Sequence, residues 1–361
     1  MSEVTIQLQC HCKANTFTAT IPSSSLPLTS TWCHCTSCRH ATGNLYQSDI
    51  TWPNPNEDVS RLRAYDFSAR LRDYSCPTCR CRMLTRDVEN NFMYAPIGSL
   101  SNLPGLVKIV SNIFVGDTID GGASMWMRHT SDGKHAPRWT ASSQKGDELP
   151  FEWPGKAPPH DMKVKPSLTP LWCHCKGVKF FLRPGTDLLS LPSDKIPWYV
   201  DKPTGRYVAQ ADACDSCLKT SGADIAYWTW APFTHISTTE TPSDQPEFRT
   251  KADFLDAVVC KDPKVGTLGV YQSSQHGHRF SCSVCAAVFF FAGDKHAEQV
   301  DIAVGVLDHP DGARAEGLLK WDMSKIEFAE DGKGGWREEL YDSVVRQATT
   351  WQGTVASKAK L

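Results

Sequence analysis

The chain has 361 residues and a formal net charge of −2. This length suits about two domains, since single domains usually contain roughly 100 to 200 residues. The near-neutral charge gives no overall attraction to nucleic acid or to an anionic membrane, and no basic stripe with interleaved aromatic residues is present. No secretion signal and no apolar run of about 18 residues occurs. We therefore expect a cytoplasmic protein without nucleic-acid or membrane partners, and the sequence leaves its oligomeric state open.

Short β-branched or aromatic runs, punctuated by Gly and Pro, indicate strands in both halves of the chain. Strands are expected over 16–21, 107–115, 286–292 and 300–307. Helical periodicity is weak, and a single short amphipathic helix is predicted over 338–350. The predicted fold class is mainly β with minor helix.

Prolines gather between the two halves, where lysines separate them. Proline removes backbone donors and stiffens a chain into an extended spacer. The cluster consists of Pro150, Pro154, Pro158, Pro159, Pro166 and Pro170. We predict a first domain at 1–156, a Pro-rich linker at 157–169 and a second domain at 170–361.

Thirteen of the fifteen cysteines follow a pattern that occurs twice. Each copy has a Cys-x-Cys pair, a three-ligand cluster and a Cys-x-x-Cys pair. The first copy is Cys10 and Cys12, then Cys33, Cys35 and Cys38, then Cys76 and Cys79. The second copy is Cys173 and Cys175, then Asp212, Cys214 and Cys217, then Cys282 and Cys285. Residues 96–100 and 303–307 also echo one another, so the sequence predicts two tandem copies of one metal-binding domain.

The spacing of these cysteines favours metal over disulfides. Cysteines two apart in a strand point to one face and have no relaxed disulfide geometry, and a reducing compartment disfavours such bonds. A Cys-x-x-Cys turn aims two sulfurs at one point, and two pairs complete a tetrahedral zinc shell. Reduced core cysteines are the alternative, but they would have no reason to repeat their spacing. We expect three or four zinc ions per chain.

The cluster of Cys33, Cys35 and Cys38 supplies three ligands, which leaves a fourth position for water or substrate, as in catalytic zinc sites. Three thiolates make zinc a weak Lewis acid that suits a soft sulfur ligand better than the activation of water. A thiol coordinated there would lose its proton, and could then attack or release a carbonyl carbon. The pattern therefore predicts reversible formation of a carbon–sulfur bond.

Two alternatives stay open for this region. The cluster could be a second structural zinc site closed by His34, His40 or Cys81, although His34 should point to the opposite face of its strand. Cys81 could also replace Cys79 in the four-cysteine shell. Arg39 could bind a substrate carboxylate through two hydrogen bonds, or it could form an ordinary surface salt bridge.

The second cluster has Asp212 where a third cysteine is expected. Either its carboxylate replaces the thiolate and makes a harder zinc site, or the site is lost and Cys214 and Cys217 hold no metal. In the second case only the four-cysteine shell remains in this half. His276 and His278 precede Cys282 and could line the same pocket.

The run CHCTSCR at 33–39, followed by Gly43, resembles the signature of the glutathione-dependent formaldehyde-activating enzyme family, also called the CENP-V/GFA family. Flanking runs agree with it: CHC at 10–12, SCPTC at 75–79, NIFV at 112–115 and LPF at 149–151. The likeness extends over both halves, although DACDSCL at 212–218 lacks the first cysteine and the arginine.

This resemblance implies two tandem Mss4-like zinc-binding domains of small coiled β-sheets, each with one structural and one exposed zinc. By position, the structural ligands of the first domain are Cys10, Cys12, Cys76 and Cys79. Again by position, the catalytic residues are Cys33, Cys35, Cys38 and Arg39. The implied activity is that of a carbon–sulfur lyase resembling S-(hydroxymethyl)glutathione synthase, with glutathione as co-substrate and a small carbonyl compound. A zinc-dependent biosynthetic enzyme on another substrate, or a non-catalytic zinc-binding interaction module, are the alternatives.

Overall fold

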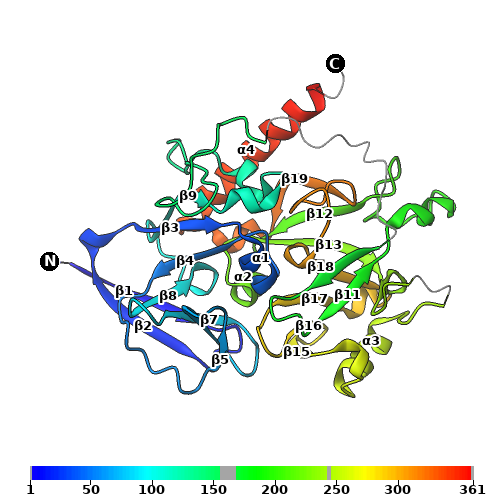
Figure 1. The fold of residues 1–361 in the computed structure, drawn as a ribbon, viewed down its shortest axis with the longest axis horizontal. Helices are drawn as coiled ribbons and strands as arrows, with labels where there is room; N and C mark the ends of the chain where they lie inside the picture. Colours follow the sequence, from blue (N-terminus) through cyan, green and yellow to red (C-terminus); the bar gives the residue numbers. More distant parts are fainter. Residues whose placement is uncertain (1, 155–167, 242–244, 359–361) are drawn as a thin grey trace.

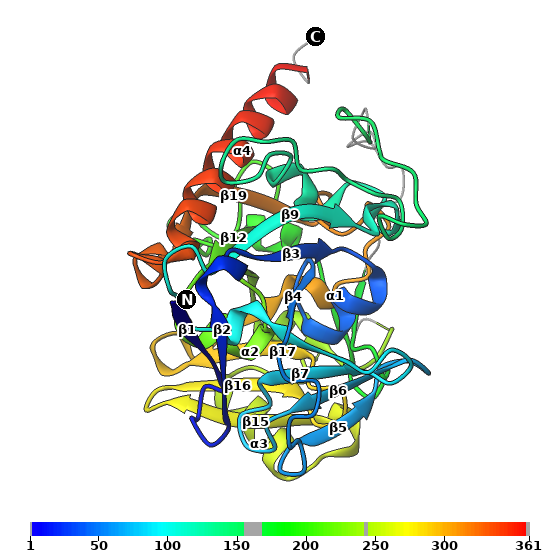
Figure 2. The same ribbon diagram turned by 90° about the vertical axis from the view of Figure 1, so that its left-hand side faces the viewer.

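The computed structural model describes residues 2–154, 168–241 and 245–358, and its overall arrangement is shown in Figures 1 and 2. Strands dominate and helices are few, which confirms the predicted fold class. Most of the predicted linker at 157–169 lies outside the described residues. The domain boundaries at 156 and 170 therefore stay predictions.

The first half contains a hairpin and one seven-stranded sheet. The hairpin pairs β1 (Glu3–Gln9) with β2 (Thr16–Pro22). The sheet has the order β5-β6-β7-β8-β4-β3-β9, in which only β3 and β9 run parallel. Its strands are β3 (Leu28–Cys33), β4 (Gln47–Thr51), β5 (Arg63–Asp66), β6 (Leu71–Ser75), β7 (Arg82–Asp87), β8 (Phe92–Pro96) and β9 (Val107–Ile113).

The large sheet of the second half repeats this strand order, whereas its small sheet has one strand more than the first hairpin. A small sheet joins β10 (Thr169–Trp172), β11 (Lys179–Leu182) and β14 (Ile236–Ser237). The large sheet has the order β15-β16-β17-β18-β13-β12-β19, again with one parallel pair, β12 and β19. Its strands are β12 (Tyr207–Asp212), β13 (Ala226–Pro232), β15 (Leu268–Ser274), β16 (Gly277–Cys282), β17 (Val288–Gly293), β18 (Gln299–Ala303) and β19 (Leu319–Glu327).

The described residues contain four α-helices: α1 (Thr36–Thr42), α2 (Asp215–Ser221), α3 (Lys251–Val259) and α4 (Trp336–Lys358). Helix α4 confirms and extends the helix predicted over 338–350, whereas the other three were not predicted. Helices α1 and α2 are too short to show periodicity in the sequence. Helix α3 begins with a capping box between Thr250 and Asp253, which is a sequence signal for the N-terminus of a helix. No described helix combines the length and apolarity needed to cross a bilayer.

Short 3-10 turns connect these elements: η1 (Ser23–Ser25), η2 (Ile97–Ser99), η3 (Val115–Thr118), η4 (Gly122–Trp126), η5 (Gly185–Ser190), η6 (Phe233–His235), η7 (Pro263–Val265), η8 (Asp294–His296), η9 (Val304–Val306) and η10 (Ala329–Gly332). Strands β2, β9 and β17 confirm three of the predicted strands. The fourth, 300–307, overlaps β18 but then continues into the turn η9. Because η2 follows β8 as η9 follows β18, the structure explains the echo between 96–100 and 303–307.

The two halves meet through a reciprocal backbone contact near the middle of the molecule in Figure 1. Helix α1 packs against η9, and α2 packs against η2. The N–H of Gly305 donates to the carbonyl oxygen of Gly43, and the N–H of Gly98 donates to that of Gly222, each over 3.0 Å. A Cβ atom at Gly305 would lie 2.1 Å from the carbonyl oxygen of Asn44. Only glycine therefore permits this approach.

Helix α4 ties the end of the chain to the first half. Figure 2 shows it along one edge of the molecule beside β19, and it also packs against η4. The side-chain oxygen of Gln347 accepts hydrogen bonds from the N–H groups of Arg128 and His129, each over 2.8 Å. The guanidinium of Arg337 donates to the carbonyl oxygens of Ile97 and Leu100. The first half is therefore covered by the last helix of the chain.

We predict that Gly305→Ala lowers the free energy of unfolding by about 1 to 3 kcal/mol, because the new methyl group would overlap the backbone of Asn44. Gly353→Ala on α4 is the matched control: nothing lies within 4 Å of a Cβ there, and alanine favours helix by up to about 1 kcal/mol. Urea denaturation followed by tryptophan fluorescence measures both. Equal stability of Gly305→Ala and the wild type would contradict the proposed contact.

Candidate metal centres

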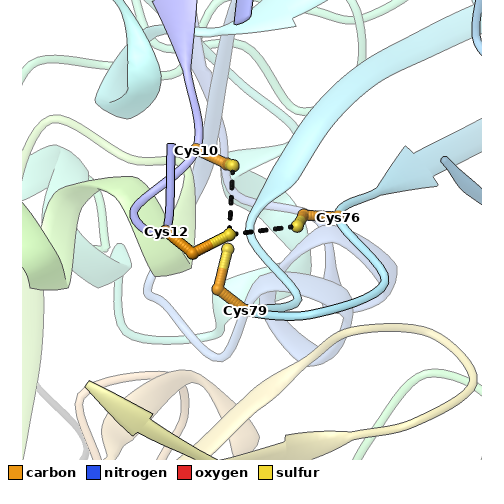
Figure 3. A group of neighbouring side chains, drawn as sticks. All are labelled: Cys10, Cys12, Cys76 and Cys79. Atoms are coloured by element: carbon orange, nitrogen blue, oxygen red, sulfur yellow. Dashed lines mark hydrogen bonds between the residues drawn. The ribbon is translucent and has the colours of Figure 1, made fainter. Parts of the chain in front are cut away.

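Four cysteine sulfurs converge between the loop after β1 and the turn between β6 and β7 (Figure 3). They belong to Cys10, Cys12, Cys76 and Cys79, and all four Sγ atoms lie within 4.8 Å of one another. The Sγ of Cys12 lies 3.5 Å from those of Cys10 and Cys76. A disulfide would need about 2.05 Å, whereas a tetrahedral zinc with 2.3 Å bonds separates its sulfurs by roughly 3.8 Å. The arrangement fits a closed four-thiolate zinc shell.

Neighbouring groups donate hydrogen bonds to these sulfurs. The backbone N–H of Asn15 donates to Cys10 over 3.3 Å, and its side-chain amide donates to Cys76 over 3.2 Å. Such bonds stabilise thiolate charge, as the outer contacts of metal sites commonly do. Cys81 lies 3.4 Å from Cys79, but the mutually close group contains Cys79. The geometry therefore supports Cys79 as the ligand.

The three-cysteine cluster is built by the end of β3 and the start of α1. Cys33 ends β3, and Cys35 is the N-cap of α1, where its sulfur accepts a hydrogen bond from the N–H of Cys38 over 3.3 Å. Hydrogen bonds from the thiols of Cys33 and Cys38 lower the pKa of Cys35 to about 3. All three cysteines are partly exposed. Gly43, in the left-handed conformation at φ 78°, ends the helix.

The described residues place no fourth His, Cys, Asp or Glu ligand in this cluster. His34 is fully buried on the opposite face, as expected, where its Nε2 donates to the side-chain oxygen of Asn112 over 3.0 Å. His40 stacks on Trp172 and donates from Nδ1 to its carbonyl oxygen over 2.7 Å. Cys81 lies beside the four-cysteine shell. The described geometry thus supports an open three-ligand site.

Arg39 lies beside the open cluster and not on the surface. It is 6% exposed, and one guanidinium nitrogen donates to the hydroxyl of Thr36 over 3.3 Å. Its Nε–H has no hydrogen-bond partner among the described residues, and no carboxylate of those residues lies within salt-bridge distance of its guanidinium. Burial lowers its pKa, and the charges of Asp120 and Cys35 oppose that shift. The alternative of an ordinary surface salt bridge is therefore wrong.

A family model described as glutathione-dependent formaldehyde-activating enzyme matches residues 5–117. This stretch contains the first four-cysteine shell and the open three-cysteine cluster. Residues 5–117 are therefore similar to this family, in agreement with the resemblance of the run at 33–39. No curated protein and no solved structure matches the chain. Membership of the second half in the same family stays a prediction, because the match ends before it.

The second half nevertheless contains the same kind of closed shell as the family domain. The sulfurs of Cys173, Cys175, Cys282 and Cys285 lie within 4.8 Å of one another. The two shells are also connected across the interface. His11 hydrogen-bonds through Nδ1 to the hydroxyl of Tyr271 over 2.9 Å, and His174 hydrogen-bonds in the same way to Tyr65 over 2.7 Å. Each Cys-His-Cys turn therefore contacts the other half through its histidine.

The second open cluster retains its frame but changes one ligand. Asp212 ends β12 as Cys33 ends β3, and Cys214 is the N-cap of α2. A carboxylate oxygen of Asp212 and the sulfurs of Cys214 and Cys217 lie within 4.8 Å of one another. Asp212 also accepts the N–H of Cys214 over 2.9 Å, which orients its carboxylate. The three residues fit a zinc ion, which favours replacement of the thiolate over loss of the site.

A cavity of about 790 Å³ opens beside this cluster. The predicted histidines do not line it: His276 pairs with Asp294 over 3.1 Å, and His278 lies apart from its walls. Arg279 does line it, and sequence analysis missed this residue. A comparison of the two halves could have identified it. Arg279 stands three residues before Cys282, and the equivalent residue of the first half, three before Cys76, is Asp73.

We predict four zinc ions per chain, one for each cluster. Cys76→Ser, Cys35→Ser and Cys214→Ser should each lose one ion, but Cys76→Ser should lower stability most, because structural zinc binding is coupled to folding. Elemental analysis and thermal unfolding measure these effects, and Cys260→Ser, at an exposed cysteine, is the control. Three ions in the wild type, with none lost in Cys214→Ser, would show that the Asp212 cluster binds no zinc.

Proposed function

We propose that the first half catalyses reversible carbon–sulfur bond formation between a thiol and a small carbonyl compound, with glutathione and formaldehyde as substrates. The observation that carries this proposal is the open three-cysteine cluster, which is partly exposed and has no fourth ligand among the described residues. The match of residues 5–117 to the family model supports the choice of substrates. The proposal also places the enzyme in the cytoplasm, with small molecules as its partners.

Zinc held by Cys33, Cys35 and Cys38 would supply a site at which a substrate thiol loses its proton. The chain holds these ligands in place through α1. The N–H of Cys38 donates to Cys35, and the hydroxyl of Thr42 donates to the carbonyl oxygen of Cys38 over 2.9 Å. In the forward direction the thiol sulfur bonds to the carbonyl carbon, and the thiol proton ends on the carbonyl oxygen. The reverse direction breaks the same bond, as a lyase does.

Arg39 is suited to bind a carboxylate of the thiol substrate. Its buried Nε–H has no partner among the described residues, and an unsatisfied buried donor on a charged group costs free energy until an acceptor binds it. Glutathione carries two carboxylates, so one of them can accept this hydrogen bond while the thiol reaches the cluster. Arg39 thereby selects acidic thiols over neutral ones.

We predict that Cys35→Ser reduces the exchange of glutathione with its formaldehyde adduct to the uncatalysed rate, because the cluster loses a ligand. Exchange spectroscopy by NMR is the suitable measurement, since the two substrates also condense spontaneously. Cys260→Ser should retain the wild-type rate. A wild-type enzyme that gives no acceleration above background would contradict the proposed reaction.

We predict that Arg39→Gln raises the KM for glutathione by about tenfold or more, the usual effect of losing a hydrogen bond to a charged group. The KM for 2-mercaptoethanol, which has no carboxylate, should change little in the same variant. Arg346→Gln, at an exposed arginine on α4, is the matched control. An equal rise in KM for both thiols would show that Arg39 supports the fold of the site and does not bind substrate.

A further inference from the structure

The cavity beside the second open cluster has the size of a small-molecule site. Its volume of about 790 Å³ falls within the range of roughly 300 to 1,000 Å³ that is typical of ligand pockets. Strands β12, β13, β15, β16, β17, β18 and β19 and helix α2 form most of its walls, while Trp198 and Phe328 reach it from outside the strands. Nothing in the first half's proposed reaction uses this space.

Aromatic side chains form much of the wall. They are Trp198, Trp228, Trp230, Phe291 and Phe328. Trp198 and Trp230 lie 5.0 Å apart between ring centroids, with their planes tilted by 54°. Trp198 is 57% exposed and Phe328 is 52% exposed, which is a large apolar area for two neighbours of one cavity. A flat apolar ligand would remove this area from water and stack on the rings.

Arg279 supplies a buried positive charge at the same cavity. It is 6% exposed, and its Nη2 donates to the hydroxyl of Ser216 over 2.7 Å and to the sulfur of Cys217 over 3.2 Å. Its Nη1 and Nε have no hydrogen-bond partner among the described residues. A buried guanidinium with unsatisfied N–H groups is costly unless an acceptor completes it. The missing partner is therefore an acceptor, and an anion is the best one.

The other charged residues of the wall do not supply that partner. No carboxylate of the described chain forms a salt bridge with Arg279. Glu327 pairs with Lys325 over 2.9 Å, and Asp212 is engaged by the backbone of Cys214. Asp301, the third carboxylate of the wall, accepts a hydrogen bond from the side-chain amide of Gln299 over 3.4 Å, and burial raises its pKa to about 7. In the first half the equivalent position is Asp73, which is already paired with Arg82 inside the fold. At this position of the sheet, a buried cation without a carboxylate partner therefore occurs in the second half and not in the first.

We propose that this cavity binds a flat aromatic carboxylate, with its ring among the tryptophans and its carboxylate accepting a hydrogen bond from Nη1 or Nε of Arg279. The carboxylate satisfies the buried guanidinium, and the ring covers the exposed faces of Trp198 and Phe328. This site is separate from the first half's three-cysteine cluster and does not depend on the reaction proposed there.

Isothermal titration calorimetry on the full chain tests the proposal with two probes of equal shape, 1-naphthoate and its neutral analogue 1-naphthamide. Naphthoate should bind at least tenfold more tightly than naphthamide, because only the anion pairs with Arg279. Arg279→Gln should remove this preference and leave the naphthamide affinity unchanged. Arg346→Gln, which alters an exposed arginine outside the cavity, should keep both affinities.

Trp198→Ala is a second variant, and it should fold normally because Trp198 is largely exposed. It should weaken the binding of both probes by a similar factor, since each loses the same stacking surface. Equal affinity for the two probes in the wild type would overturn the proposal, as would failure of both to bind. Naphthoate binding that survives in Arg279→Gln but is lost in Cys214→Ser would also overturn it, because the carboxylate would then bind at the metal cluster.

Discussion

The reciprocal backbone contact between the halves is the constraint on which the rest of the molecule depends. Gly305 donates to Gly43, and Gly98 donates to Gly222, so two hydrogen bonds of equal length fix the two halves together. Gly43 and Gly222 also end α1 and α2, whose opposite ends carry the open clusters. The interface therefore fixes the C-terminal end of each helix whose N-terminal end carries an open cluster. Neither cluster can be understood as a property of its own half alone.

The two halves share one frame and differ in the polarity of their open sites. In both halves the closed shell joins two loops that are distant in the sequence, and a zinc ion bound there would couple metal binding to folding. No such contribution to folding is required of the open sites. The first has Cys33, the buried Arg39 and an Asp73–Arg82 pair that is neutral overall. The second has Asp212 and Arg279, which donates to Ser216 and Cys217 but forms no salt bridge within the described residues. The same strand order thus supports two different chemical environments.

The sequence was informative where chemistry is local. The spacing of the cysteines identified the four groups whose possible ligand atoms lie within 4.8 Å of one another, and the alternation of side chains along a strand placed His34 away from the cluster. It was uninformative where the outcome depends on tertiary contacts. Helix α1 has seven residues, and its ends are set by Cys35 and Gly43, with too few turns for a periodic pattern.

Arg279 illustrates the same limit. An arginine in a strand is ordinarily a solvated residue, and its role follows from which walls close around it. Those walls come from segments as distant as Trp198 and Phe328. Only the assembled sheet shows that its guanidinium is buried beside Cys217 without a full set of acceptors.

The position of α4 has a consequence for folding during synthesis on the ribosome. Gln347 contacts His129, which precedes it by 218 residues. At about 5 to 20 residues per second, the ribosome needs on the order of 10 to 40 seconds to add that length. During this interval the nascent first half lacks both its partner sheet and its covering helix. Until the later segments are made, η2, α1 and η4 of the first half lack the contacts with α2, η9 and α4 that cover them in the complete fold.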